Sequence, residues 1–70
     1  MMQIGTMISS RVSYRADTHP QGRIVDVSRG DVGVIVQRWR CGLRKKYLVK
    51  FLRNPDELVW ALPGTIRRLA

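Results

Sequence analysis

The sequence has few of the features that usually stabilise a very small domain. Its 70 residues include one cysteine, Cys41, which excludes an internal disulfide. Cys41 and the single His19 are the only soft metal ligands, whereas structural zinc sites take about four ligands. A domain of this size buries only about 60% of its unfolded surface. Self-association is the remaining source of extra burial, and we therefore expect a homo-oligomer.

Long apolar runs are also missing. No segment approaches the roughly 20 residues that a transmembrane helix needs. Residues 1–5 lack the charged start and the apolar stretch of a signal peptide. A lone cysteine without a secretion signal is typical of a reducing compartment. We therefore expect a cytoplasmic protein that does not interact with a membrane.

Acidic residues are scarce, and they offer little for catalysis. Only five Asp and Glu oppose thirteen Lys and Arg, so the net charge is +8. Asp17 and His19 share a loop-like segment, where such a pair is usually solvated, and Cys41 has no partner base in its segment. The sequence contains no triad, glycine-rich phosphate loop or metal-ligand cluster. We therefore predict that the protein is not an enzyme and uses neither a cofactor nor a metal.

The chain does contain short apolar runs separated by turn residues, which predict an all-β fold. Strand-like runs occur at residues 8–14, 22–27, 32–39 and 46–51, and all but the second show the period-two alternation that is typical of a half-buried strand. Residues 16–22 are rich in strand breakers and predict a long loop. Within the third run, we expect Val34 and Val36 to be buried, together with Val49 of the fourth run.

The last third of the chain has two interpretations. Residues 54–57 suit either a helix N-terminus or a type I turn. Pro63-Gly64 ends the following apolar run after five residues, which is too short for a typical helix. We therefore favour a hairpin with a strand at residues 58–62. A single 3-10 turn at residues 63–65 and a closing strand at residues 66–69 complete the prediction.

Three sequence patterns together resemble a known class of fold. Residues 30–36 follow the pattern G-D-x-G-x-I-V, residues 47–51 follow Y-x-V-x-F, and Leu62-Pro63 precedes the final strand. This combination resembles small prokaryotic SH3-like barrels and is similar to KOW and Tudor-type modules. The resemblance covers roughly residues 22–69 and implies a five-stranded barrel. The length of the chain predicts one domain over residues 1–70, in which we expect residues 1–6 to be flexible. Such barrels bind RNA, DNA, peptides or proteins, so the fold does not choose a function.

Residues 47–51 are also similar to a strand of chromodomains, in which aromatic side chains hold a methylated ammonium group. That likeness implies a cage of Tyr14, Phe51 and Trp60. The +8 charge would repel a basic peptide, and Phe51 has the spacing of a core residue. One SH3-like barrel is a dihydrofolate reductase that confers trimethoprim resistance, but residues 59–62 lack the Gln and Tyr of its pore strand.

The basic residues give the strongest indication of function. A pI near 11.2 is typical of nucleic-acid-binding domains, and Arg outnumbers Lys by ten to three. Cations that hold phosphates beside an exposed aromatic ring are typical of single-strand binders. We predict a phosphate-directed, weakly sequence-specific module for DNA or RNA, with a protein-protein interaction module as the alternative. The predicted nucleic-acid-binding residues are Arg38, Trp39, Arg40, Arg44, Lys45, Lys46, Lys50, Arg53, Trp60, Arg67 and Arg68.

Overall fold

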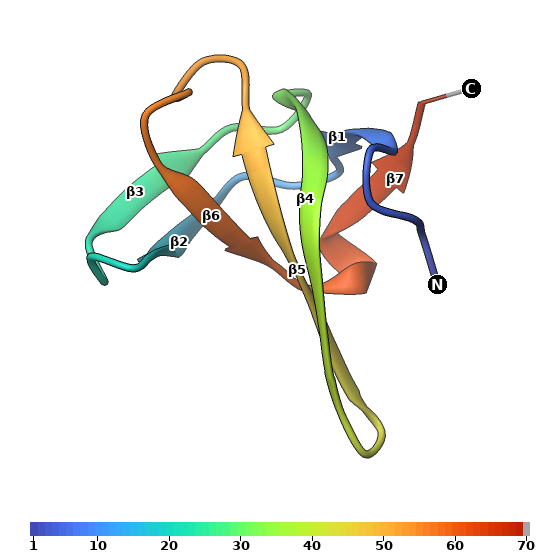
Figure 1. Cartoon of the computed structure of the whole chain (residues 1–70). Coiled ribbons are helices and arrows are strands. Elements are labelled where there is room, and N and C mark those ends of the chain that lie inside the picture. The colour runs from blue at the N-terminus through green and yellow to red at the C-terminus, as the bar shows by residue number, and fades with distance from the viewer. Residues whose placement is uncertain (70) are drawn as a thin grey trace.

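A computed structural model describes residues 1–69 of the chain. In it, seven antiparallel strands form one strongly curled sheet, a half-barrel, in the order β3-β2-β6-β5-β4-β1-β7 (Figure 1). The elements are β1 (Met7–Ser10), β2 (Tyr14–His19), β3 (Ile24–Val27), β4 (Val32–Cys41), β5 (Arg44–Phe51), β6 (Leu58–Ala61), the 3-10 turn η1 (Pro63–Thr65) and β7 (Ile66–Arg68). The all-β class and the 3-10 turn before the last strand are confirmed, whereas the sheet has seven strands rather than five.

The strand without a predicted counterpart is β2, which lies in the N-terminal third, where the predicted boundaries were wrong. Residues 8–14 do not form one strand, because β1 ends at Ser10, whose hydroxyl donates a 2.6 Å hydrogen bond to the Val12 carbonyl. Such local bonds compete with strand pairing. The predicted loop at residues 16–22 is instead mostly strand β2, paired with β3. Thr18 is buried there, and its hydroxyl is satisfied because it exchanges hydrogen bonds with the backbone of Arg23.

The core lies on the concave face of the sheet, and it corrects the predicted orientation of β4. Ile35 is fully buried and packs with Val49 and Phe51, whereas Val34 and Val36 are only partly buried. Gly33 shares the core-facing side, where a Cβ atom would lie 2.7 Å from Val49 Cγ1. Side chains of β5 therefore fill the space that a side chain at position 33 would occupy. Because Gly33 has no side chain, this face of β4 contains few apolar residues in the sequence and was not predicted to face the core. The predicted burial of Val49 is confirmed.

The β4–β5 hairpin extends beyond the body of the half-barrel (Figure 1). Arg40 pairs with Lys45, and Cys41 pairs with Arg44. Gly42 has φ of +60°, and a glycine with positive φ at the first central position is typical of a tight type II′ hairpin turn. The strands thus continue further than predicted and leave only Gly42 and Leu43 in the turn.

The hairpin prediction for the last third is confirmed. Residues 54–57 form turns rather than a helix, and the amide of Asn54 donates to the Phe51 carbonyl at 3.1 Å. β6 then pairs with β5 through Leu48–Trp60 and Val49–Val59.

Among residues 1–69, no helix has the length and apolar character that crossing a membrane would take.

The N-terminal residues run beside β4. The amide of Gly5 donates to the Ile35 carbonyl at 2.7 Å, and the Ile35 amide donates to Thr6. The Met2 amide donates to the buried Tyr47 hydroxyl at 3.0 Å. The flexibility expected for residues 1–6 stays a prediction.

Candidate functional site

A β-bulge in β4 decides where Trp39 lies. Ile35 pairs with Val49, but the next pairing is Gln37 with Leu48, so Val36 is an extra residue. In an uninterrupted strand, Trp39 would share the core-facing side with Ile35. The bulge reverses that alternation and turns Trp39 to the outer face. Trp39 pairs there with Lys46 and stays 43% exposed.

A lysine lies between the two tryptophans on this outer face. Lys46 Nζ is 4.9 Å from the ring centre of Trp39 and 3.9 Å from that of Trp60. Both distances fall within cation–π range, about 6 Å. His19 meets the Trp60 ring edge-on, with 5.7 Å between ring centres. The four side chains come from β2, β4, β5 and β6, so the curled sheet brings together residues distant in sequence.

These side chains border an open groove of about 560 Å³. Leu48 is 3% exposed and forms part of its lining, opposite Trp60 in the β5–β6 pair. We call it the tryptophan groove, and its lining residues are His19, Gln37, Arg38, Trp39, Lys46, Leu48, Leu58 and Trp60. A neighbouring hollow shares Trp39 and Lys46 and adds Arg44, Lys45 and Leu62. Neither lining includes an acidic residue, so the electrostatic potential of both favours anions.

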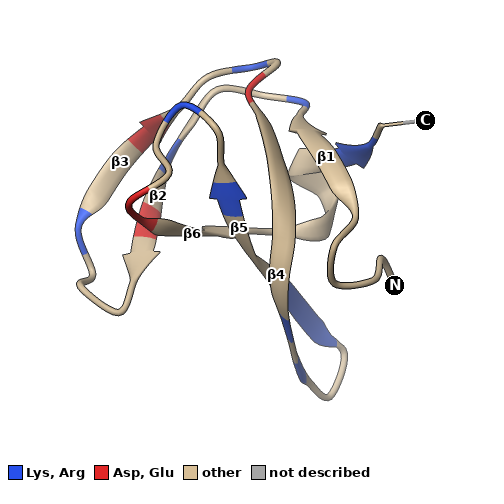
Figure 2. Ribbon diagram, turned by 45° about the horizontal axis from the view of Figure 1, so that its top comes forward, with Lys and Arg blue, Asp and Glu red and all other residues tan. Residues whose placement is uncertain are grey.

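The hairpin beyond the groove carries concentrated positive charge (Figure 2). Arg40 and Lys45 lie directly opposite each other in the β4–β5 pair. Like charges in this position destabilise a sheet, because the paired Cβ atoms are about 5 Å apart. The Arg40 guanidinium also donates to the Gly42 carbonyl at 3.3 Å, which holds it near the turn. A bound anion would relieve this repulsion.

The structure gathers most, but not all, of the predicted residues. Arg38, Trp39, Lys46 and Trp60 line the tryptophan groove, and Arg44 and Lys45 line the adjoining hollow. Lys50 is exposed and pairs with Leu58 at the groove edge. Arg67 and Arg68 belong to β7, which pairs with β1 and is separated from β6 by three strands in the sheet order. Neither arginine lines the tryptophan groove or the adjoining hollow.

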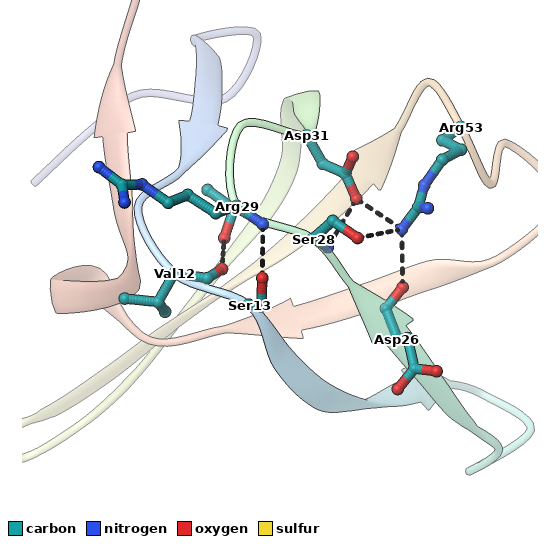
Figure 3. A network of polar contacts seen from close by, with 8 residues as sticks. Val12, Ser13, Asp26, Ser28, Arg29, Asp31 and Arg53 are labelled. Atoms are coloured by element: carbon teal, nitrogen blue, oxygen red, sulfur yellow. Dashed lines mark hydrogen bonds and ion pairs between the residues drawn. The ribbon is translucent and has the colours of Figure 1, made fainter.

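Arg53 has a structural role rather than a place in the groove. Its Nη2 atom lies 2.8 Å from Asp31 Oδ2 and donates to the Ser28 hydroxyl and the Asp26 carbonyl (Figure 3). Asp31 also accepts a 2.8 Å hydrogen bond from the Ser28 amide. Arg53 thereby ties the loop after β5 to the turn before β4, and its charge is already paired.

The aromatic cage that the chromodomain likeness implies does not form, and the core position predicted for Phe51 from its spacing is confirmed. Phe51 is 2% exposed and belongs to the core. Tyr14 donates from its hydroxyl to the Trp60 carbonyl at 3.1 Å, which fixes β2 against β6. Burial raises the pKa of Tyr14 to about 12, an effect partly offset by a hydrogen bond with Thr65. The Trp60 ring instead contacts Lys46 of the same chain, whose Nζ atom lies 3.9 Å from the ring centre.

Four groove-lining residues were not among the residues predicted from the sequence: His19, Gln37, Leu48 and Leu58. Their positions in the groove depend on the bulge at Val36 and on strand β2, neither of which was predicted. The one signal in the sequence was Leu48 beside Tyr47, since consecutive apolar residues on a strand imply that both faces are covered.

Among the described residues, no group of three or more His, Cys, Asp or Glu could hold a metal ion.

No family model matches the chain, and no curated protein or solved structure gives a significant match.

Proposed function

We propose that the protein binds single-stranded nucleic acid in the tryptophan groove. The observation that carries this proposal is the half-exposed Trp39 beside Lys46, in a groove without acidic lining residues. A nucleobase can stack on an exposed indole ring, and such stacking contributes about 1–3 kcal/mol per base. Because every base has a π-face, the contact carries little sequence information.

The hairpin would bind the phosphates that accompany these bases. Arg44, Lys45 and Lys46 are consecutive and adjoin Trp39, so a strand stacked on the indole passes a run of cations. Phosphate contacts release condensed counterions, which makes the affinity fall with salt. The Arg40–Lys45 repulsion favours the same ligand, because an anion beside the pair reduces its energetic cost.

We also propose that the half-barrel is an elaborated SH3-like barrel. Without the β2–β3 hairpin, the strand order reduces to the five strands β6-β5-β4-β1-β7. The 3-10 turn precedes β7, and β7 pairs with β1, the first strand of the chain. The β2–β3 hairpin then occupies the position of the first variable loop of such barrels. This interpretation supports a binding role without choosing the ligand.

A protein-interaction module is the second candidate, and exposed apolar side chains favour it. Leu43 is 97% exposed at the hairpin turn, and Leu62 is 61% exposed beside the hollow that adjoins the groove. An acidic peptide with apolar anchors, or a second copy of the chain, could cover these residues. Sedimentation at micromolar concentration would detect the second copy as a species heavier than 8.1 kDa.

The test is a titration of fluorescein-labelled single strands and matched duplexes of DNA and RNA, at ~50 and ~200 mM salt. We expect micromolar affinity for single strands that weakens at the higher salt. Trp39→Ala should weaken binding roughly fivefold to hundredfold. Leu52→Ala is the matched control, because Leu52 is exposed and apolar but does not line the groove. The absence of binding at low salt would reject the proposal and favour the protein module.

A further inference from the structure

A second basic hollow, of about 330 Å³, lies at the β1–β7 edge of the sheet. We call it the arginine pocket, and its lining residues are Ser9, Ser10, Arg11, Arg29, Gly30 and Arg67. They come from β1, the bend after it, the turn before β4, and β7. Figure 2 shows the positive charge of β7 on a different part of the molecule from the hairpin. None of these residues lines the tryptophan groove.

Backbone pairing holds the walls of the arginine pocket in place. Ser9 lies directly opposite Arg67 in the β1–β7 pair. The Gly30 amide donates to the Ser10 carbonyl at 2.8 Å, which fastens the turn to β1. Gly30 has φ of +91°, a conformation that favours glycine. The Arg29 amide donates to the Ser13 hydroxyl at 3.0 Å. The three arginines thus extend from positioned backbone.

The charge of this pocket is not neutralised within the described chain. Arg11, Arg29 and Arg67 take part in none of the ion pairs formed among residues 1–69. The acidic residue of the same turn, Asp31, is already bound by Arg53 and the Ser28 amide. In Figure 3 the Arg29 side chain extends away from that network. Three arginines therefore line one hollow whose lining contains no acidic residue.

The Ser9 hydroxyl supplies a donor of a different kind. Arg67 Nε donates to Ser9 Oγ at 3.2 Å, so this hydroxyl acts as an acceptor. Among residues 1–69, no hydrogen bond uses its proton, although Ser9 is only 5% exposed. A serine hydroxyl can donate one hydrogen bond while it accepts another. An oxygen of an anion in the pocket would satisfy this proton, while Arg67 orients the hydroxyl.

We infer that the arginine pocket binds a phosphate group. Guanidinium groups match phosphate oxygens with paired, charge-assisted hydrogen bonds, and a hydroxyl donor completes the set. The pocket volume lies near the lower limit of small-ligand sites, about 300 Å³. A terminal phosphate of a nucleic acid and a small phosphorylated metabolite share this chemistry. The inference does not depend on binding in the tryptophan groove.

The test is a titration of the full chain with inorganic phosphate at constant ionic strength, followed by amide and arginine Nε NMR shifts. We expect saturable shifts at Ser9, Gly30 and Arg67. Arg29→Gln and Arg67→Gln should each weaken binding about tenfold, which corresponds to one charge-assisted hydrogen bond. Arg15→Gln, outside the pocket, is the control and should bind like wild type. Arg29 makes no side-chain hydrogen bond among residues 1–69, so its variant keeps the fold intact.

Two further ligands distinguish the source of the phosphate. A short oligonucleotide with a 5′-phosphate that binds more tightly than its unphosphorylated form indicates a nucleic-acid end. A sugar phosphate that binds more tightly than both indicates a metabolite. Equal affinity of wild type, Arg29→Gln and Arg67→Gln for phosphate would overturn the inference, as would identical shifts with chloride. Trp39→Ala should leave phosphate binding unchanged, which separates this result from the fate of the proposed function.

Discussion

The two halves of strand β4 differ in almost every property although they share one hydrogen-bonded pairing with β5. Residues 32–35 include Ile35, which is fully buried, and Gly33, which allows β5 to approach closely. Residues 37–41 are exposed and carry Arg38, Trp39 and Arg40. The single extra residue Val36 separates the two halves. The first half therefore stabilises the fold, and the second half presents the side chains of the proposed site.

This division has a physical consequence for substitutions. A change before the bulge removes buried contacts and lowers the free energy of unfolding. A change after it alters groups that contact water, which usually changes stability by less than about 0.5 kcal/mol. Stability and binding should thus respond to different halves of one strand.

The largest expected effect is that of Ile35→Ala. It removes a fully buried side chain in contact with the core and should cost about 2–5 kcal/mol of unfolding free energy. Urea denaturation monitored by circular dichroism measures the loss. Val34→Ala is the control, because Val34 is only partly buried on the outer face and should cost clearly less. Equal costs for the two variants would contradict the observed orientation of β4.

Gly33→Ala should have the next largest effect. The added Cβ atom would lie 2.8 Å from the Lys50 carbonyl oxygen, which is backbone and cannot move aside without shifting β5. We expect a loss of about 1–3 kcal/mol, as for other overpacked positions. Gly64→Ala provides a comparison, since nothing lies within 4 Å of the Cβ atom there. A neutral Gly33→Ala would mean that the two strands are further apart than described.

Tyr14→Phe should have a moderate effect that depends on pH. At neutral pH it removes the hydrogen bond to the Trp60 carbonyl, at a cost of about 1 kcal/mol. Burial raises the pKa of Tyr14 from 10.0 to about 12, so the folded state retains this proton more tightly than the unfolded state. That contribution is complete below pH 10 and is lost as the pH rises toward about 12. Urea midpoints across this range should fall more steeply for wild type than for Tyr14→Phe.

The smallest effect on stability, and one of opposite sign, is expected for Lys45→Glu. This change converts the Arg40–Lys45 repulsion into an attraction and should stabilise the hairpin by about 0.2–1 kcal/mol. The same change should weaken binding of single strands and reduce its dependence on salt. Thermal melts and oligonucleotide titrations measure the two responses. An increase in both stability and affinity would contradict a phosphate-binding role for the hairpin.

The fold class was predictable from the sequence because turn residues separate short alternating runs along most of the chain. Trp39 was predicted as a binding residue and is exposed, but the alternation behind that prediction wrongly placed Val34 and Val36 in the core. The bulge at Val36, which gives Trp39 its direction, was not predictable, because it depends on how β4 pairs with β5 rather than on local composition. Strand β2 was missed for a related reason. Ala16 and Thr18 are small or polar, and they are buried only because β3 and β6 cover them. The basic hairpin was recognisable because its charged residues are close in sequence. The groove was not, because its lining residues come from four strands that are distant in sequence.

The central claim is that Trp39 stacks with a nucleobase, and the fluorescence of a single tryptophan tests it most directly. Trp60→Phe leaves Trp39 as the only tryptophan of the chain. Addition of an unlabelled single-stranded oligonucleotide at low salt should quench its emission with the same micromolar midpoint as the labelled titration, and added salt should reverse the quenching. Binding without any change in Trp39 emission would contradict this claim and would mean that nucleic acid binds at another part of the molecule.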